Sequence, residues 1–436
     1  METKSIQQFF NSYSLKMVVV SVLAIVLLIP SFLIQEIIQE RIALSDQVKN
    51  ELFGQWGGKQ VISGPVLNVP YKILEPVGNN LGYAEKSGVA HFLPETLNVE
   101  GEMVSESRKR GIYKVVVYEG KLGMSGSFAQ PDVSRLDMPN ANFNWDAAYF
   151  TMGISDMRGI KNLPELILNG QRITVESGVA DNDLFTSGIT VKPDTMESSM
   201  PLSFEIDLVL NGSEDLSVEA LGKISDVKVS SVWPHPGFTG GFLPSSREVT
   251  ADGFNASWQV THLNRNFPQQ WTDNKFKTDG ARLGVELIIP VDHYQKSMRS
   301  VKYAILFIAL NFIVFIFIEI SSKVRIHPFQ YSLVAFALII FYALLTSLGE
   351  QIGFNLSYLV SAVAVTALIT WFSASLLRNS TMALRVAALQ AGLYIFLFAI
   401  LQLNDYALLT GSVGLFIILA VIMKASLKVK WYSDTE

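Results

Sequence analysis

The sequence predicts a membrane protein with six transmembrane helices, one near the N-terminus and five near the C-terminus. A large all-β, sandwich-like domain is inserted between the first helix and the second. Two observations predict this fold class. Five closely spaced apolar runs lie between Val301 and Met423, each about long enough to cross a hydrocarbon core roughly 30 Å thick. Upstream of them, from Arg41 to Arg299, charged residues, Gly, Pro and Asn are frequent.

The first predicted helix is residues 17–34, an apolar run that follows a polar N-terminal segment, residues 1–16. It contains Pro30, which membrane helices tolerate. The run is longer than the apolar core of a signal peptide, and no A-x-A pattern follows it. We interpret it as an uncleaved signal anchor; a removed signal peptide is the alternative.

The distribution of Lys and Arg predicts the orientation of the spans. Positive and non-positive segments alternate, with Glu350 and Asp405 in the non-positive loops. The positive segments contain Lys4, Lys16, Lys323, Arg325, Arg378, Arg385, Lys424, Lys428 and Lys430. Both termini, including the tail at 426–436, are therefore expected in the cytoplasm, and residues 35–300 outside it. Three residues before the second span depart from the rule: Lys296, Arg299 and Lys302.

Residues 35–56 are predicted to form a juxtamembrane helix. Apolar residues recur there at roughly helical spacing, among them Ile38, Ile42 and Leu52. The helix could act as a rigid stalk or as a surface for a partner helix. The alternative is that it packs on its own domain.

Residues 57–298 are predicted to form the β-rich domain, an antiparallel sandwich of two sheets. The segment 202–210 alternates strictly between apolar and polar residues, as a half-buried strand does. Asn169-Gly170 and Asn211-Gly212 fall between such runs and predict tight hairpin turns. The segment SESRKRGI is expected to be helical.

The composition excludes several function classes. The net charge of −5 and the absence of basic runs argue against nucleic-acid binding. Cysteine is absent, which excludes disulfides and thiolate chemistry. The five histidines form no metal-binding motif, and no nucleophile elbow, P-loop or dinucleotide fingerprint is present. We therefore predict no catalytic residue, metal or cofactor.

Two loops are candidates for ligand binding. In TMGISDMRGIKN, Asp156 and Arg158 could bind an anionic group, or they could organise a turn. In VWPHPGFTGGFLP, Trp233, His235 and Phe238 could line a sugar or peptide groove, or the aromatic residues could pack into the domain.

Arg265 lies at a bend in the segment ASWQVTHLNRNFPQQW and has the same two interpretations.

In the bundle, Asn311 and Gln390 are the main polar residues expected at depth, and such residues more often join helices than bind solutes. Glu319 is expected at the inner end of its helix. An ion-coupled transporter would place a carboxylate near mid-membrane, and the predicted bundle has none there.

The chain resembles the CreD family of bacterial inner-membrane proteins over nearly its whole length. The matching stretches are ERIALSDQVKNELFGQWGGKQVISGPVLNVPY, MGISDMRGI, WPHPGFTGGFLP, FNASWQVTHLNRNFPQ, VDHYQKSMRSVKYAILFI, IHPFQYSLVAFALIIFYALLTSLGEQIGFNLSYL and ILQLNDYALLTGSVGLFIILAVIM. The resemblance implies a Gram-negative inner-membrane protein with a periplasmic domain, linked to cell envelope integrity, colicin tolerance and the response to β-lactam stress. It supplies no catalytic residues.

Three functions are compatible with these observations. The first is a non-enzymatic envelope-maintenance protein whose β domain binds or stabilises an envelope component. The second is a transporter or lipid-handling protein, and the third is a membrane-anchored enzyme that processes carbohydrate or peptide with carboxylates of the β domain. The expected partners are membrane lipids, together with cell-wall or other envelope components or another inner-membrane protein.

Overall fold

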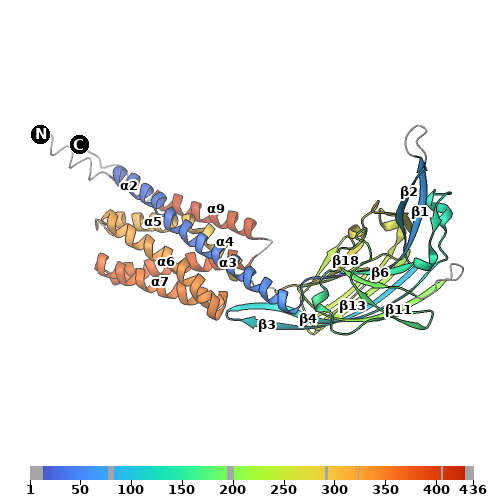
Figure 1. Cartoon of the computed structure of the whole chain (residues 1–436). Helices are drawn as coiled ribbons and strands as arrows, with labels where there is room; N and C mark the ends of the chain where they lie inside the picture. The colour runs from blue at the N-terminus through green and yellow to red at the C-terminus, as the bar shows by residue number, and fades with distance from the viewer. Residues whose placement is uncertain are drawn as a thin grey trace. The chain divides into compact units, whose positions relative to one another are not determined.

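The computed structural model describes residues 13–76, 83–193, 201–289, 293–322, 324–403 and 406–427. The chain divides into two compact units, Met1–Asp46 with Val291–Glu436, and Gln47–Pro290. Figure 1 shows that the first is helical and the second is built almost entirely of strands. Asp405 and most of the N- and C-terminal segments used to predict the orientation lie outside the described residues.

The helical unit contains helices from both ends of the chain. They are α2 (Tyr13–Val26), α3 (Leu28–Trp56), α4 (His293–Lys302), α5 (Ala304–Ser322), α6 (Pro328–Ile352), α7 (Phe354–Leu377), α8 (Ser380–Gln402) and α9 (Ala407–Ser426). Pro30 has no N–H to donate to the carbonyl of Val26, which explains why α2 ends there and α3 begins anew. Gly353, with φ of 77°, separates α6 from α7, and the Asn379 side chain caps α8.

Four helical segments of the described residues are long and apolar enough to cross a membrane: Val18–Trp56, Pro328–Ile352, Phe354–Leu377 and Ser380–Gln402. A fifth is obtained if α4 and α5, bent by 47° against each other, count as one span. The remaining apolar helix, Leu409–Lys424, is shorter. The structure thus supports four to five of the six predicted spans.

The bend between α4 and α5 bears on the three basic residues that depart from the charge rule. Lys296, Arg299 and Lys302 all lie on α4, whereas the apolar run begins with α5 at Ala304. Lys296 Nζ donates to Gln402 Oε1 at 3.0 Å. These charges therefore belong to a separate short amphipathic helix and not to the apolar helix that follows it.

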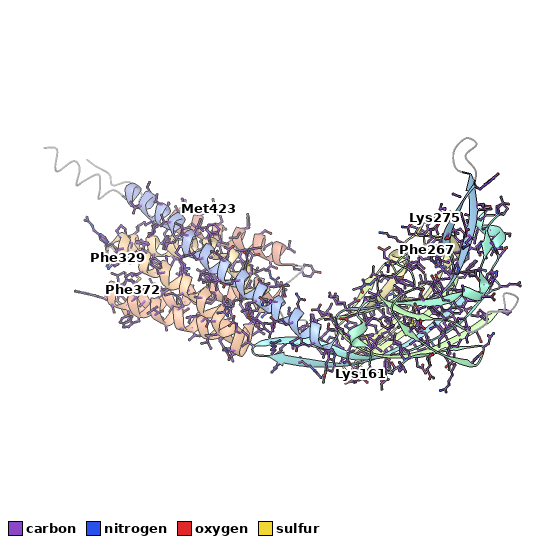
Figure 2. The ribbon with its side chains drawn as sticks, in the orientation of Figure 1. Lys161, Phe267, Lys275, Phe329, Phe372 and Met423 are labelled. Carbon is purple, nitrogen blue, oxygen red and sulfur yellow. The ribbon has the colours of Figure 1, made fainter. Side chains whose placement is uncertain are left out.

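The surface of the helical unit is apolar. Phe329 and Met423, labelled in Figure 2, are 65% and 63% exposed. Many other large apolar side chains of α6 to α9 are also exposed, including Phe336, Val363, Trp371, Ile395 and Phe416. A helix bundle that is apolar outside as well as inside is suited to lipid and not to water.

The β unit contains two sheets. The ten-stranded sheet comprises β1 (Gln60–Pro76), β2 (Tyr83–Phe92), β5 (Asn142–Phe143), β6 (Tyr149–Ile154), β9 (Glu176–Ser177), β10 (Gly188–Val191), β12 (Asp215–Glu219), β14 (Pro236–Gly240), β17 (Gln270–Thr272) and β18 (Arg282–Leu287). The eight-stranded sheet comprises β3 (Thr96–Arg110), β4 (Tyr113–Phe128), β7 (Glu165–Leu168), β8 (Gln171–Thr174), β11 (Leu202–Ser213), β13 (Ile224–Ser231), β15 (Ser246–Thr250) and β16 (Gly253–Thr261).

One hydrophobic core joins the two sheets. It contains Ile62 and Leu67 of β1 from one sheet, and Val99, Leu208 and Val227 from the other. In β11 buried and exposed residues alternate from Leu202 onward, as the period of two predicts. The domain is therefore a sandwich with both inner faces buried.

The prediction of a purely antiparallel domain is wrong at two places. β1 pairs with β12 in parallel, and β13 pairs with β3 in parallel. Each pair joins strands that are far apart in the chain, so no hairpin dictates their direction. All other ladders between the described strands are antiparallel, and the long β3–β4 hairpin is the most extensive of them.

Two local predictions are also wrong. SESRKR is not helical, because it forms the end of β3 opposite β4. Asn211-Gly212 does not form a turn but lies within β11. There Gly212 pairs with Tyr118, and a Cβ at Gly212 would lie 2.3 Å from the tyrosine ring. Asn169-Gly170, in contrast, forms the β7–β8 turn with positive φ at both residues.

Candidate functional site

The outer face of the eight-stranded sheet is hollowed. A depression of about 810 Å³ lies over β3, β4, β11, β13, β15 and β16. Its polar lining includes Glu100, Glu102, Lys121, Asp207, Lys228, Ser246, Glu248 and Asn255. A second depression, of about 460 Å³, adjoins it and adds Asn98, Ser125, Glu205 and Asp226. We call the two together the sheet hollow.

The sheet hollow is mainly acidic. Its cations are Lys121 and Lys228, and Lys228 Nζ lies 3.1 Å from Glu100 Oε1. Both partners of this pair are well exposed, so the pair holds its side chains only weakly. Carboxylates, amides and hydroxyls on an open face can accept hydrogen bonds from polyhydroxylated or cationic ligands. The hollow thus has the chemistry of a polar binding face.

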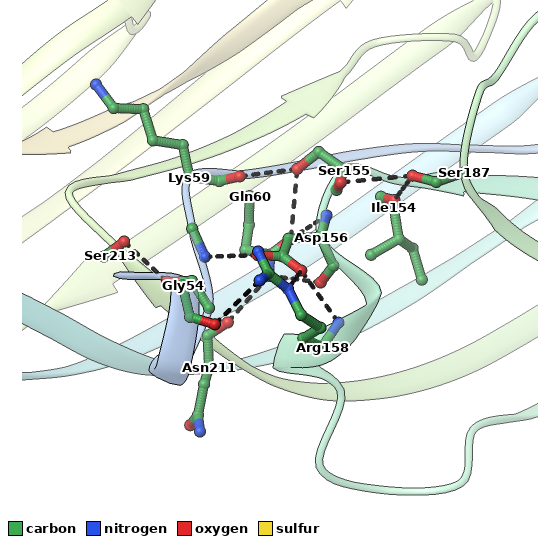
Figure 3. A network of polar contacts seen from close by, with 12 residues as sticks. Gly54, Lys59, Gln60, Ile154, Ser155, Asp156, Arg158, Ser187, Asn211 and Ser213 are labelled. Atoms are coloured by element: carbon green, nitrogen blue, oxygen red, sulfur yellow. Dashed lines mark hydrogen bonds and ion pairs between the residues drawn. The ribbon is translucent and has the colours of Figure 1, made fainter. Parts of the chain in front are cut away.

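Asp156 and Arg158 lie in a second polar region, a network shown in Figure 3. Asp156 is the N-cap of the short helix Met157–Gly159. Its Oδ2 accepts a hydrogen bond from the N–H of Gly58 at 2.9 Å. Arg158 Nη1 donates to the carbonyl of Gly54, in the last turn of α3, at 3.0 Å. Each of these contacts holds a backbone group in place, which is the role that Asp156 and Arg158 would have if they organise a turn.

The side chain of Gln60 completes this network. It is fully buried, and its Nε2 donates to the carbonyls of Asp156 and Asn211, both at 3.0 Å. Its Oε1 accepts from the N–H of Asp156 at 3.3 Å. A Cβ on Gly159 would lie 2.3 Å from the Asn211 carbonyl oxygen. We call Gln60, Asp156 and Arg158 the α3 latch.

The charge of the α3 latch follows from its hydrogen bonds. The Arg158 side chain holds the pKa of Asp156 below its ordinary value, and the N–H groups of Gly58 and Arg158 act in the same direction. The pKa of Arg158 is raised by the same pairing. Both groups are therefore charged at neutral pH.

The aromatic residues of the second candidate loop pack into the β domain. Trp233 Nε1 donates to the carbonyl of Ile288 at 3.0 Å. The Phe238 ring meets those of Phe254 and Trp258 edge to face, with centroids 6.3 and 6.0 Å apart. His235 is exposed. The structure thus separates His235 from the two aromatic side chains with which the sequence groups it.

Arg265 is almost fully buried, with 9% of its surface exposed. Its guanidinium lies over the Phe267 ring at 4.6 Å from the centroid, and Nη2 donates to Gln269. Nε and Nη1 have no hydrogen-bond partner among the described residues. Burial lowers the pKa of Arg265 to about 10, so it stays positively charged at neutral pH.

The polar residues of the bundle are buried. Asn311 Nδ2 donates to the carbonyl of Phe307 on its own helix at 2.8 Å, and Gln390 is 2% exposed. Glu319 accepts hydrogen bonds from Tyr331 Oη at 2.9 Å and from the N–H of Ile326 at 3.1 Å. The sequence did not indicate this burial of Glu319.

Sequence reasoning did not find the sheet hollow. Its residues come from six strands, and each one looks like an ordinary outward-facing strand residue. It also missed a group of potential metal ligands, His91, Asp181 and Asp183, in which the histidine precedes the two aspartates by about ninety positions. The only sequence signal related to the hollow is the alternation of apolar and polar residues, which places the polar ones on the outer face of a strand.

Residues 12–432 match the family model described as inner membrane protein CreD. The inner membrane protein CreD of Escherichia coli (strain K12) is 32% identical over 419 residues, covering 94% of this chain and 91% of that protein. A crystal structure of an M1 zinc metallopeptidase mutant from Deinococcus radiodurans covers 73% of this chain and 90% of its own. The TM-score between the two is 0.23 and their sequence identity is 8%.

Proposed function

This chain belongs to the CreD family of inner membrane proteins, and from that premise we propose that it maintains the cell envelope without catalysing a reaction. In this proposal its β domain lies on the periplasmic side and binds or stabilises an envelope component. The helical unit anchors the domain in the inner membrane, in contact with lipid.

The observation that carries this proposal is the sheet hollow. A sandwich needs only its inner faces to fold, so an outer face that is hollowed over six strands and lined by carboxylates is available for binding. Because the carboxylates outnumber the lysines, the hollow favours a polyhydroxylated or cationic ligand over an anionic one. Polyhydroxylated components of the cell wall have this chemistry.

The proposed orientation rests on the alternation of positive and non-positive segments. The chain has no cysteine, so single cysteines can be introduced without background. Leu243 and Leu263 are 78% and 82% exposed in the β domain, and Leu427 is 88% exposed after α9. Leu243→Cys and Leu263→Cys should react in intact spheroplasts with a membrane-impermeant maleimide, and Leu427→Cys only after lysis. The reverse pattern would contradict the orientation.

The functional test compares a deletion strain with complemented strains. Deletion should lower tolerance to detergents and to cell-wall antibiotics under conditions that induce the gene. The double variant Asp207→Lys with Glu248→Lys reverses two charges of the sheet hollow and should fail to restore tolerance.

The matched control reverses two exposed charges outside the hollow, Asp146→Lys with Glu176→Lys, and should restore tolerance fully. Equal tolerance of the deletion and wild-type strains under induction would refute an envelope role. Full complementation by the hollow variant would refute binding through this face.

A further inference from the structure

A buried histidine of the ten-stranded sheet faces two aspartates from a distant loop. His91 belongs to β2, and its side chain is fully buried. Its ring lies against that of Trp271, with centroids 5.7 Å apart. Asp181 and Asp183 come from the segment between β9 and β10. One ligand atom from each of the three residues lies within 4.8 Å of the others.

The hydrogen bonds of Asn68 fix which nitrogen of His91 carries the proton. Asn68 Nδ2 donates to the carbonyl of Val66 at 3.1 Å and to Thr151 Oγ1 at 2.8 Å. Its Oδ1 is therefore the acceptor that faces His91 Nδ1 at 2.7 Å. Nδ1 thus carries a proton, and in the neutral ring Nε2 presents a lone pair. A second residue that orients the imidazole in this way is typical of metal-binding histidines.

Nε2 has no hydrogen-bond partner among the described residues, although it is buried. The nearest carboxylate oxygen, Asp183 Oδ2, is 3.6 Å away, which is too far for a hydrogen bond. Two ligands of one tetrahedral zinc ion, each bound at about 2.1 Å, lie about 3.4 Å apart. The separation therefore fits two ligands of one ion better than a direct contact.

The aspartates are held in place, and the imidazole of His91 supplies a countercharge only when it is protonated. Asp181 Oδ2 accepts a hydrogen bond from Tyr149 Oη at 2.5 Å, and Asp181 Oδ1 accepts the N–H of Asp183 at 3.0 Å. No lysine or arginine of the described residues forms an ion pair with Asp181 or Asp183. Two partly buried carboxylates beside an imidazole need compensation, and a divalent cation supplies it in full.

We propose that His91 Nε2 and the carboxylates of Asp181 and Asp183 bind one divalent transition-metal ion, Zn²⁺ or Mn²⁺. Imidazole together with carboxylate oxygens is a ligand set that both ions accept. Three protein ligands leave a coordination position open. The ion would tie the segment between β9 and β10 to β2. The site goes beyond the envelope role, which needs no metal.

The test uses the full-length protein in detergent, without an affinity tag because a histidine tag binds the same ions. The protein is stripped with EDTA, loaded with ZnCl₂ or MnCl₂, desalted and measured by mass spectrometry of the metal. Competition with a chromophoric chelator then gives the affinity. The expected result is about one ion per chain, and the two loadings show which ion is preferred.

The informative variants are Asp183→Asn and Asp181→Asn, which keep the side-chain shape. Each should weaken metal binding by at least about 100-fold, the upper end of the effect of losing a second-shell partner. His235→Gln, an exposed histidine outside the group, should bind as the wild type does. Circular dichroism checks that each variant folds. If one of the two aspartate variants fails to fold, the other still tests the site.

The competing explanation is a simple ion pair between protonated His91 and Asp183. In that case the wild type retains no stoichiometric metal, and added metal does not change its melting temperature. Equal metal affinity of the wild type and Asp183→Asn would equally overturn the proposal. If the site is real, EDTA lowers the melting temperature of the wild type but not that of Asp183→Asn. A failure of the envelope tests leaves these results unaffected.

Discussion

Arg158 donates two parallel hydrogen bonds to the carboxylate of Asp156, from Nε to Oδ1 at 2.9 Å and from Nη2 to Oδ2 at 2.8 Å. This two-pronged geometry is the strongest form of a side-chain ion pair. Because Arg158 also donates to the carbonyl of Gly54, the pair fastens the last turn of α3 to the end of β6.

Replacing the charge of Asp156 should destabilise the β domain at neutral pH. Asp156→Asn keeps the shape but loses the charge-assisted bonds, at a cost of about 1–3 kcal/mol. The pKa of Asp156 is lowered in the folded protein. The contribution of the Asp156 carboxylate to stability is therefore fully present above its pKa in the unfolded chain, which is about 3.9. It is lost as the pH falls through the lower pKa of the folded protein.

Melting temperatures followed by tryptophan fluorescence at several pH values test this. The difference in melting temperature between the wild type and Asp156→Asn should be largest at pH 7 and should become smaller in strongly acidic solution. A gap that does not change with pH would show that the ionised carboxylate is not the stabilising species.

Glu219 should show the opposite dependence on pH. This carboxyl is 7% exposed, and burial raises its pKa in the folded protein. Because the pKa is raised on folding, the protonated carboxyl contributes stability that is fully present below the pKa of the unfolded chain, about 4.3. This stability is lost as the pH rises through the pKa of the folded protein. Glu219→Gln keeps an acceptor for the Thr278 hydroxyl, which lies 2.7 Å from Oε2. The variant should melt higher than the wild type at pH 8 and no higher at pH 4; a lower melting temperature at pH 8 would contradict this.

Adding one methyl group to Gly159 should destabilise the α3 latch. The new Cβ would lie 2.3 Å from the Asn211 carbonyl oxygen and 2.5 Å from Gln60 Nε2. Since one of these atoms belongs to the backbone, Gly159→Ala should cost about 1–3 kcal/mol, measured by urea unfolding of the β domain. Gly280→Ala is the control, because no atom of the described residues lies within 4 Å of a Cβ there. Equal unfolding midpoints for the two variants would show that the latch can relax at no cost.

In the helical unit, the Tyr294 hydroxyl should stabilise the packing of α4. It donates to Glu350 Oε1 at 3.0 Å, and its side chain is 3% exposed. Tyr294→Phe should cost about 0.5–1.5 kcal/mol, seen as a lower melting temperature in detergent. Tyr303→Phe, at the bend between α4 and α5, removes a hydroxyl that makes no hydrogen bond with the described residues and should change little. If Tyr294→Phe has the same melting temperature as the wild type, the Tyr294 hydroxyl does not stabilise the packing of α4.

The sequence predicts the architecture well where a local pattern reflects burial. The alternation from Leu202 to Leu210 predicts the strand because one face of β11 is buried. The sequence predicts local structure poorly where a residue that is distant in the chain determines it. Asn169-Gly170 and Asn211-Gly212 look alike locally, yet the second pair lies within a strand because Gly212 makes room for the ring of Tyr118.

The same limit applies to the candidate sites. Asp156 and Arg158 are neighbours in sequence, so their pairing could be anticipated. Gln60, which joins them from β1, could not. Four strands of the eight-stranded sheet, β3, β4, β7 and β8, separate His91 from Asp183 in the chain, and no spacing rule connects the two residues. Chemistry built from strands of different hairpins leaves no signature in one sequence.

The parallel pairing of β1 with β12 has a consequence for how the domain forms. β1 is the first strand of the domain, and its partner Leu216 follows some 150 residues later. β12 in turn pairs with the last strand, β18. Long-range pairings of this kind make folding slow, because a large loop must close before any contact rewards it. The ten-stranded sheet is completed only when the chain has been synthesised past Leu287, almost at α4. Until β18 pairs with it, one edge of β12 is exposed as a template for unwanted association. Newly made chains should therefore be most vulnerable to aggregation and proteolysis just before α4 and the helices that follow it emerge.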